Sequence, residues 1–252
     1  MKSGAQLYTV RDYIQTPEGV EQTFRKVAEI GYPAVQVSGI GPIEPERLRD
    51  IAKEYGLQIV LTHTSPDRIR NETDAVIREH RIFGCSHVGI GSMPASYERS
   101  ADGYRQFLAD FMPAARRLHD EGMKLHYHNH NFEFERYGDK TGMDILIEES
   151  DPDLLDFTVD TYWVQAGGCN PVKLLRDLAG RISMVHYKDM KIAGGGQRMA
   201  AVGKGNLDFR EITDACLAGG CEFALVEQDD TYGADPFEEL AASYRYIETL
   251  LK

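Results

Sequence analysis

Carboxylate and imidazole side chains recur at the ends of short apolar runs along the chain. Five such positions stand out in the sequence: His63, the run His126 to Glu133, Asp160, the run His186 to Asp189, and the run Glu227 to Asp230. Mixed carboxylate and imidazole donors suit a divalent transition-metal ion or Mg²⁺. The spacing therefore predicts one divalent metal ion, which is Mn²⁺, Zn²⁺, Co²⁺ or Mg²⁺.

Three histidines alternate along one of these runs. His126, His128 and His130 share one face of a strand if that strand stays regular, which would give three inward imidazoles as in a zinc triad. The alternative is a strand that ends near His128, with His126 packed lower and away from the chemistry. The sequence leaves both arrangements open.

The elements that must position these residues form a regular alternation of short apolar runs and longer amphipathic stretches. The predicted strands are Ala5–Val10, Ala34–Ser38, Gln58–Thr62, His87–Ile90, Lys124–His128, Leu155–Asp160, Ser183–His186 and Ala224–Glu227. The predicted helices are Pro17–Ile30, Glu44–Tyr55, Thr73–Phe83, Ser100–Glu121 (with a kink at Pro113), Met143–Glu149, Pro171–Leu178, Phe209–Ala218 and Pro236–Leu251.

Eight strand–helix units in 252 residues are typical of a (β/α)8 TIM barrel, an α/β fold. The sequence contains no GxGxxG motif to favour an open doubly wound sheet, and no linker or charge block divides it. We therefore expect residues 1–252 to form a single domain. In such a barrel the carboxyl ends of the strands meet at one face, which brings the predicted metal ligands together.

Composition excludes several classes of function. The chain has 28 Lys and Arg against 40 Asp and Glu, a formal net charge of −12, which argues against nucleic acid or an anionic membrane as a partner. No apolar run approaches the roughly 18 to 20 residues that span a bilayer, and the N-terminus lacks the apolar core of a signal peptide. The four cysteines form no CxxC pair and are typical of reduced thiols in a cytoplasmic protein.

Several phrases of the sequence resemble a known family. These are Gln6 to Asp12, Tyr127 to Phe134, Val159 to Trp163, His186 to Asp189, Gly203 to Asp208, and Val226 to Gln228. Together they resemble the sugar phosphate isomerase/epimerase family of xylose isomerase-like TIM barrels, in its His-Asn-His subgroup. That superfamily also includes endonuclease IV-type enzymes, but the acidic charge argues against a DNA substrate.

The resemblance implies one divalent metal bound by Glu, Asp, His and Glu from strands 5 to 8. Asp160, His186 and Glu227 match the last three ligands. For the first, the sequence offers His128 on the strand and Glu133 five residues later. We predict Glu133 as the ligand because the family keeps a carboxylate from this strand, which would leave His128 to carry a proton.

The resemblance further implies a sugar isomerase or epimerase, which abstracts a proton next to a carbonyl through a metal-bound enediolate. Glu227 would act as the base, and Glu133 or His128 would return the proton. Lys188 would steady the developing negative charge or pair with Asp189. An alternative is a dehydratase or lyase that uses the same site on an inosose or a 3-oxidised glycoside. A second alternative is a non-catalytic carbohydrate-binding barrel.

The expected partner is a small-molecule sugar or sugar derivative, and a homo-oligomer stays open. We expect the substrate-binding side chains to be Gln6, His63, Asn129, Trp163 and Lys204. Trp163 stands where related epimerases have a histidine and offers a stacking face for a sugar ring. Lys204 lies in the run Gly203-Lys204-Gly205-Asn206, which would either cradle an anion with its backbone N–H groups or serve as a hinge.

Overall fold

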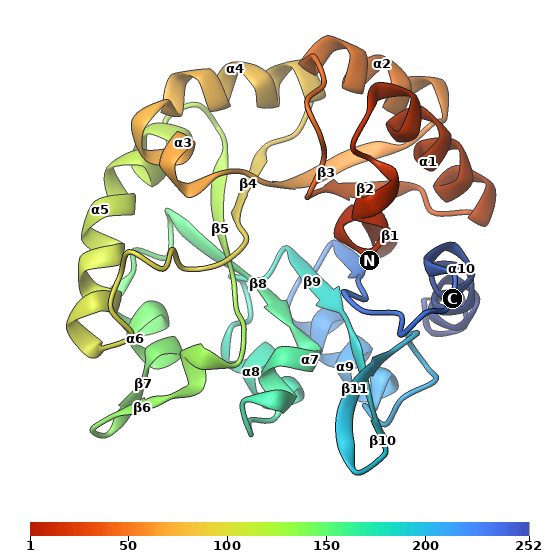
Figure 1. Ribbon diagram of the computed structural model, residues 1–252. Coiled ribbons are helices and arrows are strands. Elements are labelled where there is room, and N and C mark those ends of the chain that lie inside the picture. The colour runs from red at the N-terminus through yellow and green to blue at the C-terminus, as the bar shows by residue number, and fades with distance from the viewer. Residues whose placement is uncertain (252) are drawn as a thin grey trace.

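A closed barrel of eight parallel strands forms the centre of the computed structural model, which describes residues 1–251. Around the barrel the strands follow the order β1-β12-β9-β8-β5-β4-β3-β2, and β1 pairs with both β2 and β12, which closes the ring (Figure 1). Their bounds are β1 Lys2–Gln6, β2 Ala34–Val37, β3 Gln58–His63, β4 His87–Ile90, β5 Lys124–His128, β8 Leu155–Asp160, β9 Met184–Tyr187 and β12 Phe223–Val226. The predicted TIM-barrel fold is confirmed.

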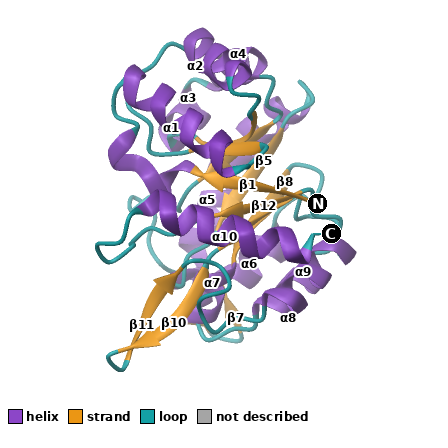
Figure 2. Ribbon diagram, turned by 90° about the vertical axis from the view of Figure 1, so that its right-hand side faces the viewer, coloured by secondary structure: helices purple, strands orange, loops and turns teal. Residues whose placement is uncertain are grey.

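Helices surround the barrel, as Figures 1 and 2 show. They are α1 Pro17–Ile30, α2 Pro45–Glu54, α3 Pro66–Asn71, α4 Thr73–Phe83, α5 Ala101–His119, α6 Gly142–Glu149, α7 Thr161–Ala166, α8 Pro171–Asp177, α9 Phe209–Ala218 and α10 Pro236–Leu250. The first of them illustrates how the sequence sets the bounds. The Thr16 side chain accepts a hydrogen bond from Gly19 N at its start, and Gly31 ends it with a φ of 117°, which favours glycine.

Two layers of apolar side chains hold the barrel together. The larger one lies between the strands and the helices, and a smaller one of Ala34, Val60, Leu61, Met184, Phe223 and Leu225 comes from β2, β3, β9 and β12. Leu61, Met184 and Leu225 each lie two residues before His63, His186 and Glu227 respectively. Because side chains alternate along a strand, these polar residues share a face with the smaller apolar layer.

The first strand differs from the prediction of Ala5–Val10. It ends at Gln6, and residues Leu7–Tyr13 form a 3₁₀ helix, η1. The Gln6 side chain accepts a hydrogen bond from Tyr8 N and so caps this helix, which turns the chain out of the sheet. In α5, by contrast, Pro113 lies within one continuous helix.

An antiparallel hairpin that the sequence analysis missed projects from the barrel after β9 (Figure 2). Its strands are β10 (Asp189–Ala193) and β11 (Gly196–Ala200), joined through Gly194 and Gly195 with φ of 61° and 78°. Two positive φ values in a two-residue connection are what a tight hairpin needs, and glycine adopts them without strain. A second small hairpin pairs β6 (Arg136–Tyr137) with β7 (Lys140–Thr141), after the 3₁₀ helix η2 (Phe132–Phe134).

Among residues 1–251, no helix is both long enough and apolar enough to cross a membrane.

Candidate active site

Four buried side chains converge at the carboxyl ends of four barrel strands. His128 ends β5, Asp160 ends β8, His186 lies on β9, and Glu227 follows β12. One nitrogen or oxygen atom from each lies within 4.8 Å of those from the other three. The structure thus brings Asp160, His186 and Glu227 together as predicted, because parallel strands deliver their carboxyl ends to one face of the barrel.

Outer partners fix which nitrogen of each imidazole faces this cluster. His128 Nδ1 donates to the carbonyl of Gly91 at 2.9 Å, so Nε2 is the nitrogen that faces the cluster, 3.3 Å from Asp160 Oδ2, and in the neutral ring it carries the lone pair. His186 Nε2 donates to Gln36 Oε1 at 2.7 Å, which leaves Nδ1 unprotonated. That Nδ1 lies 2.8 Å from Glu227 Oε2 yet makes no hydrogen bond. When both rings are neutral, two lone pairs point into the cluster, which is the arrangement that binds a cation.

The two carboxylates are held in the same manner, each by one oxygen. Asp160 Oδ1 accepts from Trp163 N at 3.0 Å, which caps α7. Glu227 Oε1 accepts from Gln6 Nε2 at 2.9 Å. The other oxygens, Asp160 Oδ2 and Glu227 Oε2, remain for the cluster. Each donor is thus oriented from outside, as metal ligands are.

The charges of the site also fit a divalent ion. The buried ammonium of Lys188 lies 3.3 Å from Asp160 Oδ2, 3.3 Å from Glu227 Oε2 and 2.7 Å from Asp229 Oδ2. Three carboxylates against one ammonium leave two negative charges, which a divalent cation would balance. The donor set of two imidazoles and two carboxylates therefore fits such an ion. Within residues 1–251 no other group of three or more His, Cys, Asp or Glu side chains is placed to hold a metal ion.

The same charges shift the pKa values of the buried groups. Burial alone would raise the pKa of Asp160, but the charge of Lys188 and the hydrogen bond from His128 lower it overall. Burial alone would lower the pKa of Lys188, and the three carboxylates around it raise it instead. Burial and the neighbouring Glu227 raise the pKa of Asp229 to about 6, against the opposing effect of Lys188. These directions describe the protein without a bound ion.

Glu133 does not join the cluster, contrary to our expectation that it supplies the metal ligand from β5. Its Oε1 accepts from Tyr127 Oη at 2.6 Å and its Oε2 from His130 N at 2.8 Å, so both oxygens are used. Tyr127 alternates with His128 along β5 and packs against Phe107 of α5, outside the barrel. The short helix η2 folds Glu133 back toward that outer face, and burial raises its pKa. His128 is the fourth converging side chain.

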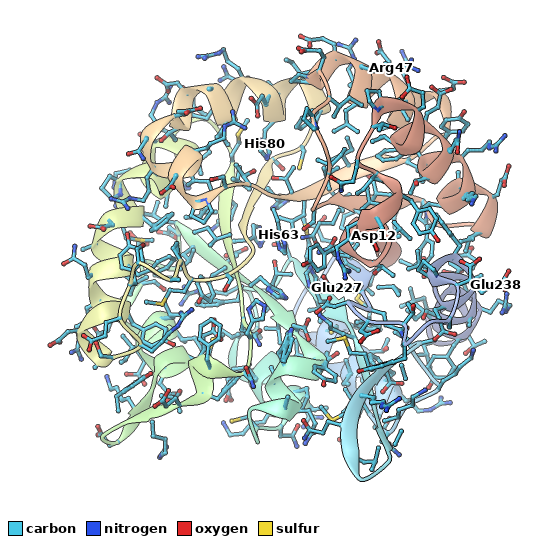
Figure 3. All side chains as sticks on the ribbon, viewed as in Figure 1. Asp12, Arg47, His63, His80, Glu227 and Glu238 are labelled. Atoms are coloured by element: carbon cyan, nitrogen blue, oxygen red, sulfur yellow. The ribbon has the colours of Figure 1, made fainter. Side chains whose placement is uncertain are left out.

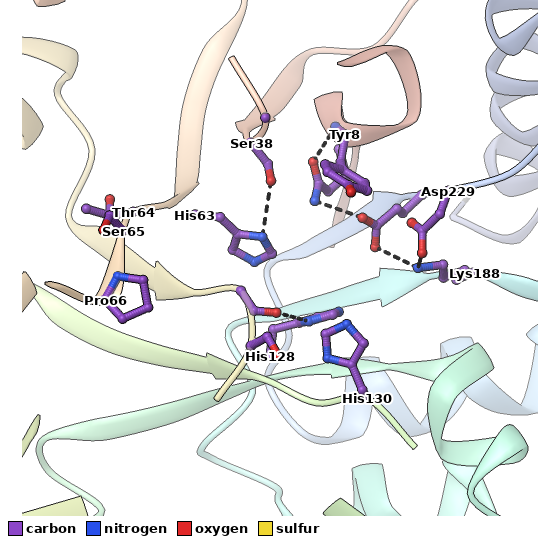
Figure 4. Close-up of a pocket in the computed structure, with 15 residues that line it drawn as sticks. Tyr8, Ser38, His63, Thr64, Ser65, Pro66, His128, His130, Lys188 and Asp229 are labelled. Atoms are coloured by element: carbon purple, nitrogen blue, oxygen red, sulfur yellow. Dashed lines mark hydrogen bonds and ion pairs between the residues drawn. The ribbon is translucent and has the colours of Figure 1, made fainter. Parts of the chain in front are cut away.

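A pocket of about 460 Å³ opens above the cluster (Figure 4). Of the predicted site residues, those that line it are Gln6, His63, His128, Lys188 and Glu227. The other lining residues are Tyr8, Ser38, Gly39, Thr64, Ser65, Pro66, Gly91, Ser92, His130 and Asp229. Figure 3 shows His63 and Glu227 near the centre of the barrel, whereas Arg47 and Glu238 lie on the surrounding helices α2 and α10. Hydroxyl, imidazole and carboxylate groups therefore dominate a cavity suited to a polar ring.

Asn129 and Trp163 lie behind the pocket and do not line it, although we expected both to bind substrate. Asn129 Oδ1 accepts from the backbone N–H of Asp160 at 3.0 Å, so it fixes a cluster residue. The Trp163 ring lies 5.3 Å from the ring of His130 and 5.3 Å from Lys188 Nζ. It therefore supports two lining residues from behind, since α7 turns back immediately after Asp160.

Lys204 is also outside the pocket, and the glycine run around it holds no free anion cradle. Its ammonium is exposed and lies 3.5 Å from Glu239. The N–H groups of Gly203, Gly205 and Leu207 all donate to the buried carboxylate of Asp189. Because Asp189 is committed to this loop, Lys188 pairs with Asp229 rather than with Asp189, correcting that alternative.

The predicted site residues include neither Asp229 nor His130, which was considered only as part of a histidine triad, and both line the pocket. His130 Nδ1 and Asp229 Oδ1 are buried without hydrogen-bond partners. Burial, reinforced by His128, lowers the pKa of His130 to about 3, so the ring is neutral at physiological pH. Their positions just beyond the ends of β5 and β12 are the sequence feature that could have identified them.

His126 lies away from the cluster. It pairs with His87 at 2.8 Å, and β5 ends at His128, which confirms the alternative to a histidine triad.

Comparisons with known proteins agree with this architecture. A family model described as xylose isomerase-like TIM barrel matches residues 24–249. An inosose dehydratase from Geobacillus kaustophilus is 28% identical over 92% of this chain and 87% of its own length.

Two solved structures share the fold. A sugar phosphate isomerase/epimerase from Parabacteroides distasonis aligns with a TM-score of 0.81 at 22% identity, covering 98% of this chain and 93% of that one. A D-psicose 3-epimerase from Clostridium cellulolyticum aligns at 0.74 with 16% identity, covering 100% of both chains. At these identities the two structures establish the fold alone.

Proposed function

The chain belongs to the xylose isomerase-like TIM barrel family, and on that premise we propose that it is a divalent-metal-dependent dehydratase of a cyclic polyhydroxy ketone such as an inosose. The observation that carries the proposal is the buried His128, Asp160, His186 and Glu227 cluster at the floor of a polar pocket. The sequence alone favoured an isomerase or epimerase and kept the dehydratase as an alternative. The reaction class proposed here is that alternative.

The relatives support this choice. Inosose dehydratases from Geobacillus and Lacticaseibacillus match 92% of this chain and most of their own length. The epimerases resemble this chain in structure, but at a sequence identity that supports a shared fold and not a shared reaction.

The distribution of acid–base groups also supports elimination. The lining carboxylates, Glu227 and Asp229, both follow β12, while His63, His128 and His130 come from β3 and β5 on another side of the pocket. Epimerisation removes a proton from one face of a carbon and returns one to the other face, which requires two opposed acid–base groups. Glu133, the carboxylate that the sequence suggested for the second role, does not line the pocket and bonds to Tyr127 and His130 instead. Dehydration needs one base and one donor to the departing hydroxyl.

The residues of the pocket divide these tasks. A divalent ion, when bound, supplies Lewis-acid polarisation of a substrate carbonyl. Glu227, oriented by Gln6, takes the proton from the carbon next to that carbonyl. His63 Nδ1 is paired with Ser38 Oγ at 3.2 Å, and its Nε2 is buried without a partner, so an N–H at Nε2 would donate a hydrogen bond to the departing hydroxyl, which leaves as water with the proton that Glu227 took.

The reaction balances without an oxidant or reductant. The C–H bond breaks, its electron pair forms the new double bond, and the next carbon loses its hydroxyl, which leaves with a proton as water. Lys188 places a positive charge beside the pocket, where negative charge develops on the substrate.

Mass spectrometry of an inosose incubated with the purified, Mn²⁺-supplemented protein tests the proposal. A dehydratase gives a product lighter by one water, whereas an epimerase or isomerase gives a product of unchanged mass that acquires deuterium in heavy water. Glu227→Gln should lower turnover by about a hundredfold or more, and the exposed Asp230→Asn serves as the matched control. Sugar binding without turnover would instead support a non-catalytic barrel and overturn the proposal.

A further inference from the structure

We propose that Lys188 and Asp229 form a charge-regulating pair that sets the metal affinity of the site, with Lys188 weakening and Asp229 strengthening the binding of a divalent ion. The inference rests on the metal site of the proposed function. Neither residue belongs to the group of converging donors. Both act on that group through charge.

Lys188 competes for the two oxygens that face the cluster. Its Nζ lies 3.3 Å from Asp160 Oδ2 and 3.3 Å from Glu227 Oε2, the oxygens left over after Trp163 N and Gln6 take the others. The side chain is 1% exposed, so water screens its charge little. An ammonium at that position stabilises the carboxylates in the absence of metal and repels a cation that binds them.

Asp229 opposes this effect. Its Oδ2 makes the shortest of the three contacts to Lys188 Nζ, at 2.7 Å, and so draws the ammonium away from the cluster. It also adds a third negative charge close to Glu227 and Asp160, and its Oδ1 is buried without a partner. Without the Asp229 carboxylate, the Lys188 ammonium would pair with Asp160 and Glu227 alone.

The backbone of Lys188 is fixed while its side chain has alternative partners. Lys188 N donates to Thr161 Oγ1 at 3.1 Å, and Thr161 Oγ1 donates to Lys188 O at 2.8 Å. Thr161 follows Asp160 directly, so the base of the lysine is tied to the strand end that carries a proposed ligand. The three carboxylates therefore compete for one tethered ammonium.

A double-mutant cycle of metal affinity tests the pair, with Zn²⁺ titrated against a chelator of known affinity. Lys188→Met removes the competing cation and should tighten Zn²⁺ binding by about tenfold or more. Asp229→Asn should weaken Zn²⁺ binding by a similar factor. The double variant restores the net charge of the site and should return the affinity toward that of the unmodified protein. Lys191→Met, on β10 of the adjacent hairpin, is the control for loss of a lysine.

Thermal unfolding gives a second readout that does not depend on activity. Lys188→Met should lower the Tm of the metal-free protein and enlarge the increase in Tm caused by saturating Zn²⁺, because tighter binding adds more stabilisation. If both single variants weaken Zn²⁺ binding, the residues have a structural role only and the inference is wrong. If the unmodified protein and Lys188→Met both fail to bind Zn²⁺, Mn²⁺ or Mg²⁺, the metal site of the proposed function fails as well.

Discussion

Exchanging the carboxylate of Glu133 for an amide separates the two candidates for the β5 metal ligand. In Glu133→Gln one amide oxygen can still accept a hydrogen bond, but the amide nitrogen then faces either Tyr127 Oη or His130 N, both of which donate to Glu133 in the structure. One buried donor therefore loses its acceptor, at a cost of about 1–3 kcal/mol in the free energy of unfolding. For a chain of this size the Tm falls by about 2–4 °C per kcal/mol. Metal binding should stay within about threefold.

His128→Gln should give the opposite result. It removes a converging nitrogen whose orientation depends on the bond to Gly91 O, so metal affinity should fall by more than the roughly 10–100-fold that loss of an outer partner costs. Its effect on the Tm of the metal-free protein should be smaller than its effect on the metal-bound protein, because the ligand contributes mainly through the ion.

Metal content of the two folded variants, measured after equilibration with Mn²⁺ or Zn²⁺, and their turnover decide the matter. Circular dichroism confirms that each variant retains its helices. Metal lost from Glu133→Gln but kept by His128→Gln would refute the assignment of His128 and restore the original expectation from the family resemblance.

Three further perturbations test the surroundings of the site. Gln36→Leu removes the acceptor that orients His186, so metal affinity should fall by about 10–100-fold in a chelator titration while the fold is kept. Gly205→Ala places a methyl group against the Asp189 carboxylate and should cost about 1–3 kcal/mol in a denaturant-unfolding measurement. Burial lowers the pKa of His80 below its ordinary 6.5, so below that pH the unfolded state binds more protons and stability falls as the pH falls. His80→Gln should remove up to about 1.4 kcal/mol per pH unit of that slope below pH 6.5.

The barrel was predictable because buried parallel strands leave continuous apolar runs and glycines mark the helix ends. The bounds of β4, β5 and β8 match the predicted segments, and so do those of α1, α4 and α9. The strand β1 was predicted too far along the chain, since Leu7 to Val10 is apolar enough for a strand but follows a glutamine that caps a 3₁₀ helix. A side-chain capping bond of this kind has no signature in hydrophobic periodicity.

The convergence of Asp160, His186 and Glu227 was predictable for a similar reason, because each stands at the end of an apolar run. Glu133, Asn129 and Lys204 lie one to five residues after the end of a strand, where one change of backbone direction moves a side chain to another face. Asp189 shows the limit clearly. Its sequence position beside Lys188 suggested an ion pair, and only the hairpin reveals that its carboxylate binds three N–H groups of the loop from Gly203 to Leu207.

The exchange of a carboxylate for His128 changes the charge of the site, and Asp229 offsets that change. The resemblance implied three carboxylates and one imidazole as ligands, whereas the structure brings together two carboxylates and two imidazoles. A neutral ligand removes one negative charge, and the adjacent Lys188 would then leave too little negative charge to hold a divalent ion tightly. Asp229 supplies the third carboxylate through Lys188 and not through the cluster itself. The identity of the β5 ligand and the presence of Asp229 are therefore two parts of one electrostatic arrangement, and His128→Glu should reduce the loss of metal affinity that Asp229→Asn causes in a chelator titration.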